Sequence, residues 1–506
     1  MTTTPAGTPT HLPAGSEPGA KGLKSNAIGF VSGVVIGVAS TAPGYSLAAS
    51  LGLVVAVVGI GVHAPVIMIA AFIPMLLIAA SYYWMNRADP DCGTTFSWVT
   101  KAMGPGLGWI GGWAIIVADV IVMANLAQIA GLYLFLLIGI DAPSAVAVTA
   151  VGVLFIAAMT WICVIGIELN AKTQIGLLAA ELITLGIFAV VALIRVYAGD
   201  APAGSVKPSL EWFNPAGIGS VTAFTSGILL AVFIYWGWDT TVTVNEETED
   251  PAETPGRAAI VSVLVLVFTY VFVTVAAVAF GGPELLANDE TGDVLGVEAT
   301  AVFGSDLLGK IVIIAVLSSA AASCQTTILP TARTALSMAR AKALPAKLGE
   351  VNPQYMTPAF ATWLMGIVSV VWYVGLTAVS QNMLLDAIAA LGLMIAFYYG
   401  LTGYACAIYY RRELFKSARN FFFIGLAPVL GALMLTAVFI KSCFDLADPA
   451  NSSSGSSWFG LGPPLVIGLG FLLMGVLLMI VWRLGGHQEF FGRKTQVADA
   501  ALVARE

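Results

Sequence analysis

The chain has 506 residues, of which 58% are hydrophobic and only 10% are charged, and its formal net charge is −7. A soluble protein normally carries about 25% charged residues, so this composition excludes an ordinary soluble enzyme and predicts a polytopic membrane protein. The five cysteines show no CxxC spacing, and the three histidines lie in tails or a short loop. We therefore expect no metal site, no bound cofactor and no nucleic-acid partner.

Twelve apolar runs are long enough to cross a bilayer, which takes about 20 residues for a helix. They follow residues 1–24, a Thr-, Pro- and Gly-rich segment without an apolar run that predicts a disordered cytoplasmic tail. The runs lie at about 28–58, 64–85, 108–138, 143–166, 173–197, 221–244, 258–281, 309–332, 359–379, 383–409, 420–441 and 463–483.

Two of these runs are interrupted in the middle, and the sequence is organised around the two breaks. The first run contains Ser40-Thr-Ala-Pro-Gly-Tyr-Ser46, where Pro43 removes a backbone donor, and the sixth contains Phe233-Ile-Tyr-Trp-Gly-Trp-Asp239. Such broken helices in corresponding places of two halves indicate a transport site at the bilayer midplane.

The positions of the breaks also predict the domain organisation. Each break opens a set of five spans, and because five is odd the second set enters the membrane from the opposite side. The sequence thus predicts an inverted repeat of 25–200 and 201–412, two appended helices in 413–485 and a cytoplasmic C-terminal tail in 486–506.

Lysine and arginine positions orient the chain. With the N-terminus inside, only Arg195, Lys207, Lys310 and Lys441 of the 22 basic residues lie outside. This asymmetry predicts an even number of spans, both termini in the cytoplasm and a location in the cytoplasmic membrane.

Four stretches carry a family resemblance: GVASTAPGYSLAA (37–49), FIYWGWDTTVTVNEETEDPAETPGRA (233–258), CQTTILPTARTALSMARAKALP (324–345) and YYGLTGYACAIYYRR (398–412). The chain resembles the amino acid–polyamine–organocation superfamily, and within it the bacterial amino acid permeases. The resemblance implies an all-α, leucine-transporter-like fold with a substrate site between spans one, three, six, eight and ten. Many members carry a Gly-Ser-Gly type of break in the first span, whereas this chain has Pro43 there.

The candidate substrate site follows from the backbone groups that a broken helix leaves unpaired. Amides after a break suit an anion, and carbonyls before it suit a cation. We expect the first break to hold a carboxylate and the second an ammonium group; a proline kink with an aromatic packing cluster is the alternative. Asp239 is expected either to pair with a substrate amine or to cap the second half-helix. In the third span, Asn125 is placed nearer the substrate than Asp119. The predicted substrate residues are Ser40, Thr41, Ala42, Gly44, Tyr45, Asn125, Phe233, Ile234, Tyr235, Trp236, Gly237, Trp238, Asp239 and Thr327.

Two further residues are predicted to couple transport to an ion. Glu181 lies deep in the fifth span with no lysine or arginine nearby in its helix. Related proton-coupled permeases often hold a lysine at this place, so the resemblance implies a coupling role; a hydrogen bond to a neighbouring helix and a sodium ligand are the alternatives. Ser323 belongs to a polar stripe of the eighth span that offers hydroxyls to the cavity, to sodium or to a helix contact. Glu246, Glu247 and Arg257 predict a cytoplasmic gate or a solvated turn.

These features predict a secondary active transporter of amino acids that works by alternating access and uses a proton gradient, with sodium as the alternative. Transport of amines or polyamines, or exchange, is possible on the same fold. A channel or a membrane enzyme is a remote alternative, since the sequence shows no phosphate loop and no nucleophile paired with a base. The expected partners are a small-molecule substrate and membrane lipid; the oligomeric state is left open.

Overall fold

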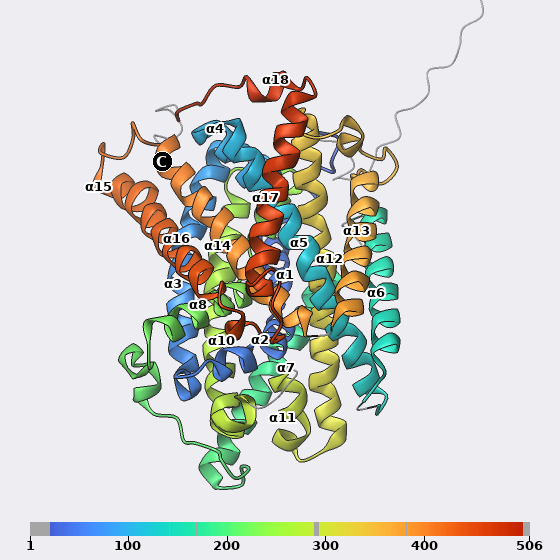
Figure 1. Ribbon diagram of the computed structural model, residues 1–506, viewed down its shortest axis with the longest axis vertical. Coiled ribbons are helices and arrows are strands. Elements are labelled where there is room, and N and C mark those ends of the chain that lie inside the picture. Colours follow the sequence, from blue (N-terminus) through green and yellow to red (C-terminus); the bar gives the residue numbers. More distant parts are fainter. Residues whose placement is uncertain (1–20, 141, 167–170, 288–292, 381, 499–506) are drawn as a thin grey trace, which may run out of the picture.

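The structure, a computed structural model, describes residues 21–140, 142–166, 171–287, 293–380 and 382–498 (Figure 1). Its regular elements are helices, and within the described residues the extended pairing is confined to three isolated bridges. The helices are α1 (Phe30–Thr41), α2 (Pro43–Ala56), α3 (Ala64–Ala88), α4 (Thr95–Met103), α5 (Pro105–Leu137), α6 (Ala145–Ile165), α7 (Ala171–Ala198), α8 (Val221–Ile234), α9 (Thr240–Thr243), α10 (Thr254–Ala287), α11 (Val294–Phe303), α12 (Asp306–Arg340), α13 (Ala359–Val379), α14 (Met383–Tyr409), α15 (Ala418–Asn420), α16 (Ala427–Asp445), α17 (Pro463–Leu484) and α18 (Gln488–Phe491).

Eleven helical segments of the described chain are long and apolar enough to cross a membrane. The predicted sixth run is not among them, because α8 ends at Ile234 after 14 residues and α9 begins only at Thr240. The all-helical membrane fold is therefore confirmed. The count of twelve spans stays a prediction, in which α8 and α9 form one broken span.

Both predicted breaks are present. Between α1 and α2, Ala42 has a φ of +49°, and Pro43 is the first residue of α2, a position where a missing amide hydrogen costs nothing. Between α8 and α9, Gly237 has a φ of +119°, a conformation that side chains with a Cβ rarely adopt. A Cβ on Gly237 would lie 2.8 Å from the carbonyl carbon and oxygen of Ser40, so the two breaks touch.

The first broken span lies at the centre of the bundle. Its most apolar stretch is 94% buried, against 22% for α17 at the periphery. α1 packs against α7, α10 and α12, while α8 packs against α2, α3 and α14. In Figure 1, α1 and α2 lie within the bundle, α4 and α18 lie at one end of it and α11 lies at the other.

The predicted tails are covered only in part. Residues 1–20 and 499–506 lie outside the described residues. The end of the predicted N-terminal tail packs on the bundle, since the Leu23 side chain is 1% exposed. In the C-terminal tail Phe490 is buried and stacks on Phe96 of α4, with ring centroids 5.6 Å apart.

Candidate substrate site

A cavity with an empty volume of about 420 Å³ lies between the two breaks. Every residue in its lining is buried, so the cavity is nearly closed in this conformation. It is lined from α1 and α2, from the α8–α9 break, and from α5, α12 and α14, by Ser40, Thr41, Tyr45, Ser46, Ile115, Asp119, Val122, Phe233, Trp236, Gly237, Asp239, Thr240, Ser323, Thr327, Pro330 and Tyr398.

The structure brings together only part of the predicted substrate set. The predicted substrate residues that line the cavity are Ser40, Thr41, Tyr45, Phe233, Trp236, Gly237, Asp239 and Thr327. Ser323, which was predicted to couple transport to an ion, also lines it. Those outside the lining are Ala42, Gly44, Asn125, Ile234, Tyr235 and Trp238.

Four polar cavity residues were absent from the predicted set: Ser46, Asp119, Thr240 and Tyr398. Asp119 carried a usable signal, because a carboxylate at membrane depth indicates a functional position. It lies six residues before Asn125, which is one and two-thirds helical turns, so the two side chains point to different faces of α5. Thr240 and Tyr398 had no comparable signal, since hydroxyls are common at helix–helix contacts in membranes.

The amides at the start of α2 are already engaged within the protein. The Gly44 amide donates to Glu181 Oε1 at 2.8 Å, the Tyr45 amide to Ser319 Oγ at 3.3 Å, and the Ser46 amide to the Ala42 carbonyl at 2.8 Å. In this conformation the acidic group that the first break holds is therefore the carboxyl group of Glu181.

Glu181 itself joins three helices. It projects from α7, its side chain is buried, and its Oε1 also accepts a hydrogen bond from Ser319 Oγ of α12 at 2.7 Å. The hydrogen bond to a neighbouring helix, one of the predicted alternatives, is thus present, and it places the carboxylate at the positive end of the α2 dipole.

Hydroxyl groups hold the two breaks against each other. Ser40 Oγ lies 2.7 Å from Thr240 Oγ1 across the contact between the breaks. Ser323 Oγ donates to the Ser40 carbonyl at 2.9 Å. At the second break, the Ile234 carbonyl accepts from the Tyr270 hydroxyl at 2.8 Å, so this predicted ammonium ligand already has a partner.

Asp239 faces tyrosine hydroxyls and forms no capping hydrogen bond to α9. The Tyr399 hydroxyl donates to its Oδ1 at 2.8 Å. The hydroxyl groups of Tyr398 and Tyr82 lie 3.4 and 3.5 Å from Asp239 Oδ2, at the weak end of the hydrogen-bond range. The carboxylate is therefore held by neutral donors.

The aromatic residues of the second break divide into cavity walls and packing. Phe233 meets Tyr45 edge to face in the cavity wall, with ring centroids 6.4 Å apart, and Trp236 donates its Nε1 hydrogen to the Tyr398 hydroxyl. Trp238 is fully buried against Tyr82 and Tyr399 outside the lining. Trp238 therefore packs against neighbouring rings and does not form part of the cavity wall.

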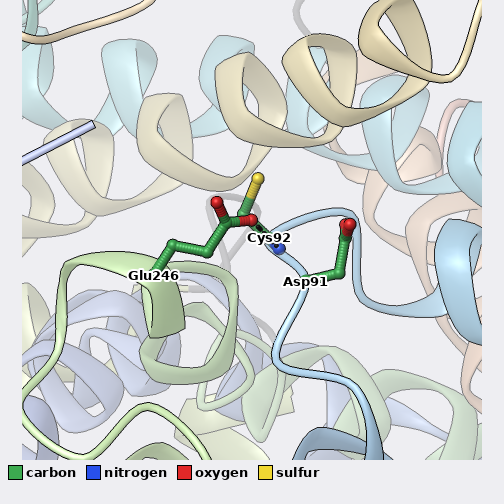
Figure 2. A group of neighbouring side chains, drawn as sticks. All are labelled: Asp91, Cys92 and Glu246. Atoms are coloured by element: carbon green, nitrogen blue, oxygen red, sulfur yellow. Dashed lines mark hydrogen bonds between the residues drawn. The ribbon is translucent and has the colours of Figure 1, made fainter. Parts of the chain in front are cut away.

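A polar cluster of Asp91, Cys92 and Glu246 lies at the end of the bundle that carries α4 (Figure 2), and Lys21 pairs with its two carboxylates. Lys21 Nζ lies 2.7 Å from Asp91 Oδ2 and 2.7 Å from Glu246 Oε1, and the Cys92 amide donates to the same Glu246 oxygen at 2.9 Å. Asp91, Cys92 and Glu246 have the spacing of metal ligands, but Lys21 already supplies the positive charge. Burial alone would raise the pKa of Asp91, yet the Lys21 ammonium lowers it to about 2.

Glu247 forms a second ion pair beside this cluster. It lies in the short helix Asn245–Glu247 and accepts from Arg333 Nη2 of α12 at 2.8 Å, and both side chains are at most 2% exposed. Arg257 instead lies 3.2 Å from Glu253. The predicted acidic cluster therefore pairs with Lys21 and Arg333, which join the N-terminal segment, the α3–α4 loop and α12.

A helical membrane bundle with two touching broken helices around a closed central cavity defines a class of secondary transporters. The chain belongs to the amino acid permease family: residues 25–474 match the family profile described as "Amino acid permease". A family of permeases is a family of transporters, so the protein is not an enzyme.

Two relatives and one solved structure illustrate the similarity. The branched-chain amino acid permease BcaP of Lactococcus lactis subsp. cremoris is 25% identical over 76% of this chain and 82% of its own length. BcaP of Bacillus subtilis is 24% identical over 60% of this chain and 65% of its own length. The crystal structure of MhsT in complex with L-phenylalanine matches with a TM-score of 0.55 and 16% identity, covering 80% of this chain and 98% of that chain. This match confirms the leucine-transporter-like fold.

Proposed function

We propose that the protein is a secondary transporter that moves amino acids, or closely related amines, by alternating access. The observation that carries this proposal is the nearly closed cavity between the two touching breaks. A cavity enclosed at the centre of the bundle suits a substrate that is released to one side at a time. The names of the relatives, which include branched-chain amino acid permeases, support amino acids as the substrate class.

We infer that the transporter lies in the cytoplasmic membrane with both termini in the cytoplasm. The distribution of lysines and arginines supports this orientation. In that orientation the Lys21 cluster and the Arg333–Glu247 pair lie at the cytoplasmic end, where they hold the inner side of the bundle closed. Opening toward the cytoplasm then requires both contacts to separate.

We further propose that Glu181 couples transport to protons. An ionised Glu181 accepts hydrogen bonds from the Gly44 amide and Ser319, and so ties α7 to α2 and α12. A proton on this carboxyl group removes the charge that the α2 dipole favours and weakens the tie. Protonation and movement of α2 are thereby linked. Ser323, which holds the Ser40 carbonyl, is the group through which sodium would act in the alternative mechanism.

Uptake into proteoliposomes tests this function. Purified protein is reconstituted, and accumulation of labelled amino acids is measured under an imposed pH gradient, a sodium gradient or neither, with protein-free vesicles as the control. We expect saturable uptake that concentrates substrate only under the pH gradient. Accumulation that follows the sodium gradient instead would refute proton coupling, and absence of uptake of every amino acid and amine tested would refute the function.

A further inference from the structure

We propose that the cavity takes a substrate with two positively charged groups, and that Asp119 and Asp239 each hold one of them. The proposal rests on the transport function above and specifies its substrate class. It makes Asp119 of α5 a specificity-determining residue.

The first line of evidence is the uncompensated charge of the cavity. Asp119 and Asp239 come from different elements and line the same enclosed space, and the lining contains no lysine, arginine or histidine. Their side chains are 3% and 5% exposed. Placing two carboxylates in such a site costs several kcal/mol per charge unless a cation compensates them.

The protein supplies only neutral donors to these two carboxylates. Asp119 Oδ2 accepts a hydrogen bond from Thr331 Oγ1 at 2.7 Å, and Asp239 Oδ1 accepts one from the Tyr399 hydroxyl at 2.8 Å. Arg333, two residues beyond Thr331, is committed to Glu247. A buried carboxylate without a cation takes up a proton instead, so a positive charge that compensates the ionised pair enters with the substrate.

The second line of evidence concerns the groups that would bind a neutral amino acid. Such a substrate carries one ammonium and one carboxylate, and its carboxylate needs free donors. The amides of Gly44, Tyr45 and Ser46 are engaged by Glu181, Ser319 and the Ala42 carbonyl. A substrate with two positive groups instead matches what the cavity offers. Diamines have this chemistry without a carboxylate, whereas a basic amino acid shares the two positive groups but brings a carboxylate that meets the same engaged amides.

Matched pairs of compounds isolate the second positive charge. L-Lysine and L-norleucine differ by the terminal ammonium group, as do 1,5-diaminopentane and pentylamine. Thermal stabilisation of the purified protein and competition for uptake are measured with all four compounds. Because a buried hydrogen bond to a charged group contributes about 1.5–3 kcal/mol, we expect each dication to act at roughly 10- to 100-fold lower concentration than its partner. The comparison of lysine with diaminopentane shows whether the two charges come from an amino acid or from an amine.

Variants assign the effect to Asp119. Asp119→Asn keeps the shape of the side chain and should remove the 10- to 100-fold discrimination between each dication and its partner. Asp386→Asn is the matched control, because this buried carboxylate on α14 accepts hydrogen bonds from the Ser453 and Ser454 amides away from the cavity. It should retain full discrimination.

A further variant covers the case in which Asp119→Asn does not fold. Thr331→Val removes only the hydroxyl that orients the carboxylate, and it should reduce the discrimination in the same direction. Equal potency of norleucine and lysine in the parent, or unchanged discrimination in the folded Asp119 variant, would overturn the proposal and leave transport standing. If a folded parent neither binds nor transports any amino acid or amine, the transport function itself fails.

Discussion

Replacement of Gly237 by alanine is expected to abolish transport, because the contact between the two breaks leaves no room for a side chain. Gly237 has a φ of +119°, and a Cβ there would lie 2.8 Å from the carbonyl carbon and oxygen of Ser40 and 2.9 Å from the Thr41 amide nitrogen. These are backbone atoms, so no side-chain rotation relieves the overlap. The unfavourable backbone conformation costs about 1–3 kcal/mol, and overpacking of a closed contact costs about 1–3 kcal/mol more.

Together these costs amount to about 2–6 kcal/mol. The protein can relieve them only by unfolding or by separating the two breaks. We expect Gly237→Ala to insert into the membrane, to unfold at a lower temperature and to lose uptake in proteoliposomes. Gly470→Ala in α17 is the control, since a Cβ there meets nothing within 4 Å and alanine favours a helix. Parental uptake and stability in Gly237→Ala would refute the close contact between the breaks.

Three further predictions concern ionisable groups. Glu181→Gln should abolish pH-driven accumulation while exchange of internal for external substrate continues, and unchanged pH-driven accumulation would contradict proton coupling. Arg333→Met leaves Glu247 buried without its partner and should destabilise the protein by about 3–5 kcal/mol in thermal unfolding, whereas the double replacement with Glu247→Leu should restore much of this. The pKa of Asp91 is lowered to about 2, so the stabilisation from its Lys21 pair is complete above about pH 4 and is lost only as the pH falls through 2. The pKa of Lys21 is raised, so its contribution persists up to at least its usual value of about 10.4. The loss of thermal stability in Lys21→Met should therefore be constant from pH 5 to 9, and a loss that varies across that range would contradict the assignment.

Both breaks could be predicted from the sequence because their causes are local. Pro43 lacks an amide hydrogen, and Gly237 can adopt a backbone conformation that its neighbours cannot. These properties act within a few residues, whatever the rest of the chain does. The same holds for the membrane spans, since an apolar stretch of sufficient length determines a spanning helix through its own hydration and hydrogen bonding. The predicted sixth span is the exception for an equally local reason: its break divides it into α8 and α9, and neither helix is long enough to cross a membrane by itself.

The contents of the site were much less predictable. Apart from the polar stripe of the eighth span, the spans that surround the cavity are largely apolar, so periodicity hardly distinguishes a face toward lipid from a face toward protein. Periodicity therefore did not separate the face of Asp119 from that of Asn125, and only the carboxylate of Asp119 at membrane depth favoured the first. Nor did it show that Tyr235 and Trp238 lie outside the cavity lining while Trp236 lies within it.

The sequence by itself determined the class of the protein, its two broken spans and the stretches that form the site. The tertiary structure alone decided the partners of the charged groups. Glu181 meets the Gly44 amide 137 residues away, Glu247 meets Arg333 across 86 residues, and Asp119 shares a cavity with Asp239. The physical reason is that a buried charge is stabilised by whatever group the packing of the helices brings within about 3 Å, and that packing depends on the whole bundle rather than on neighbours along the chain.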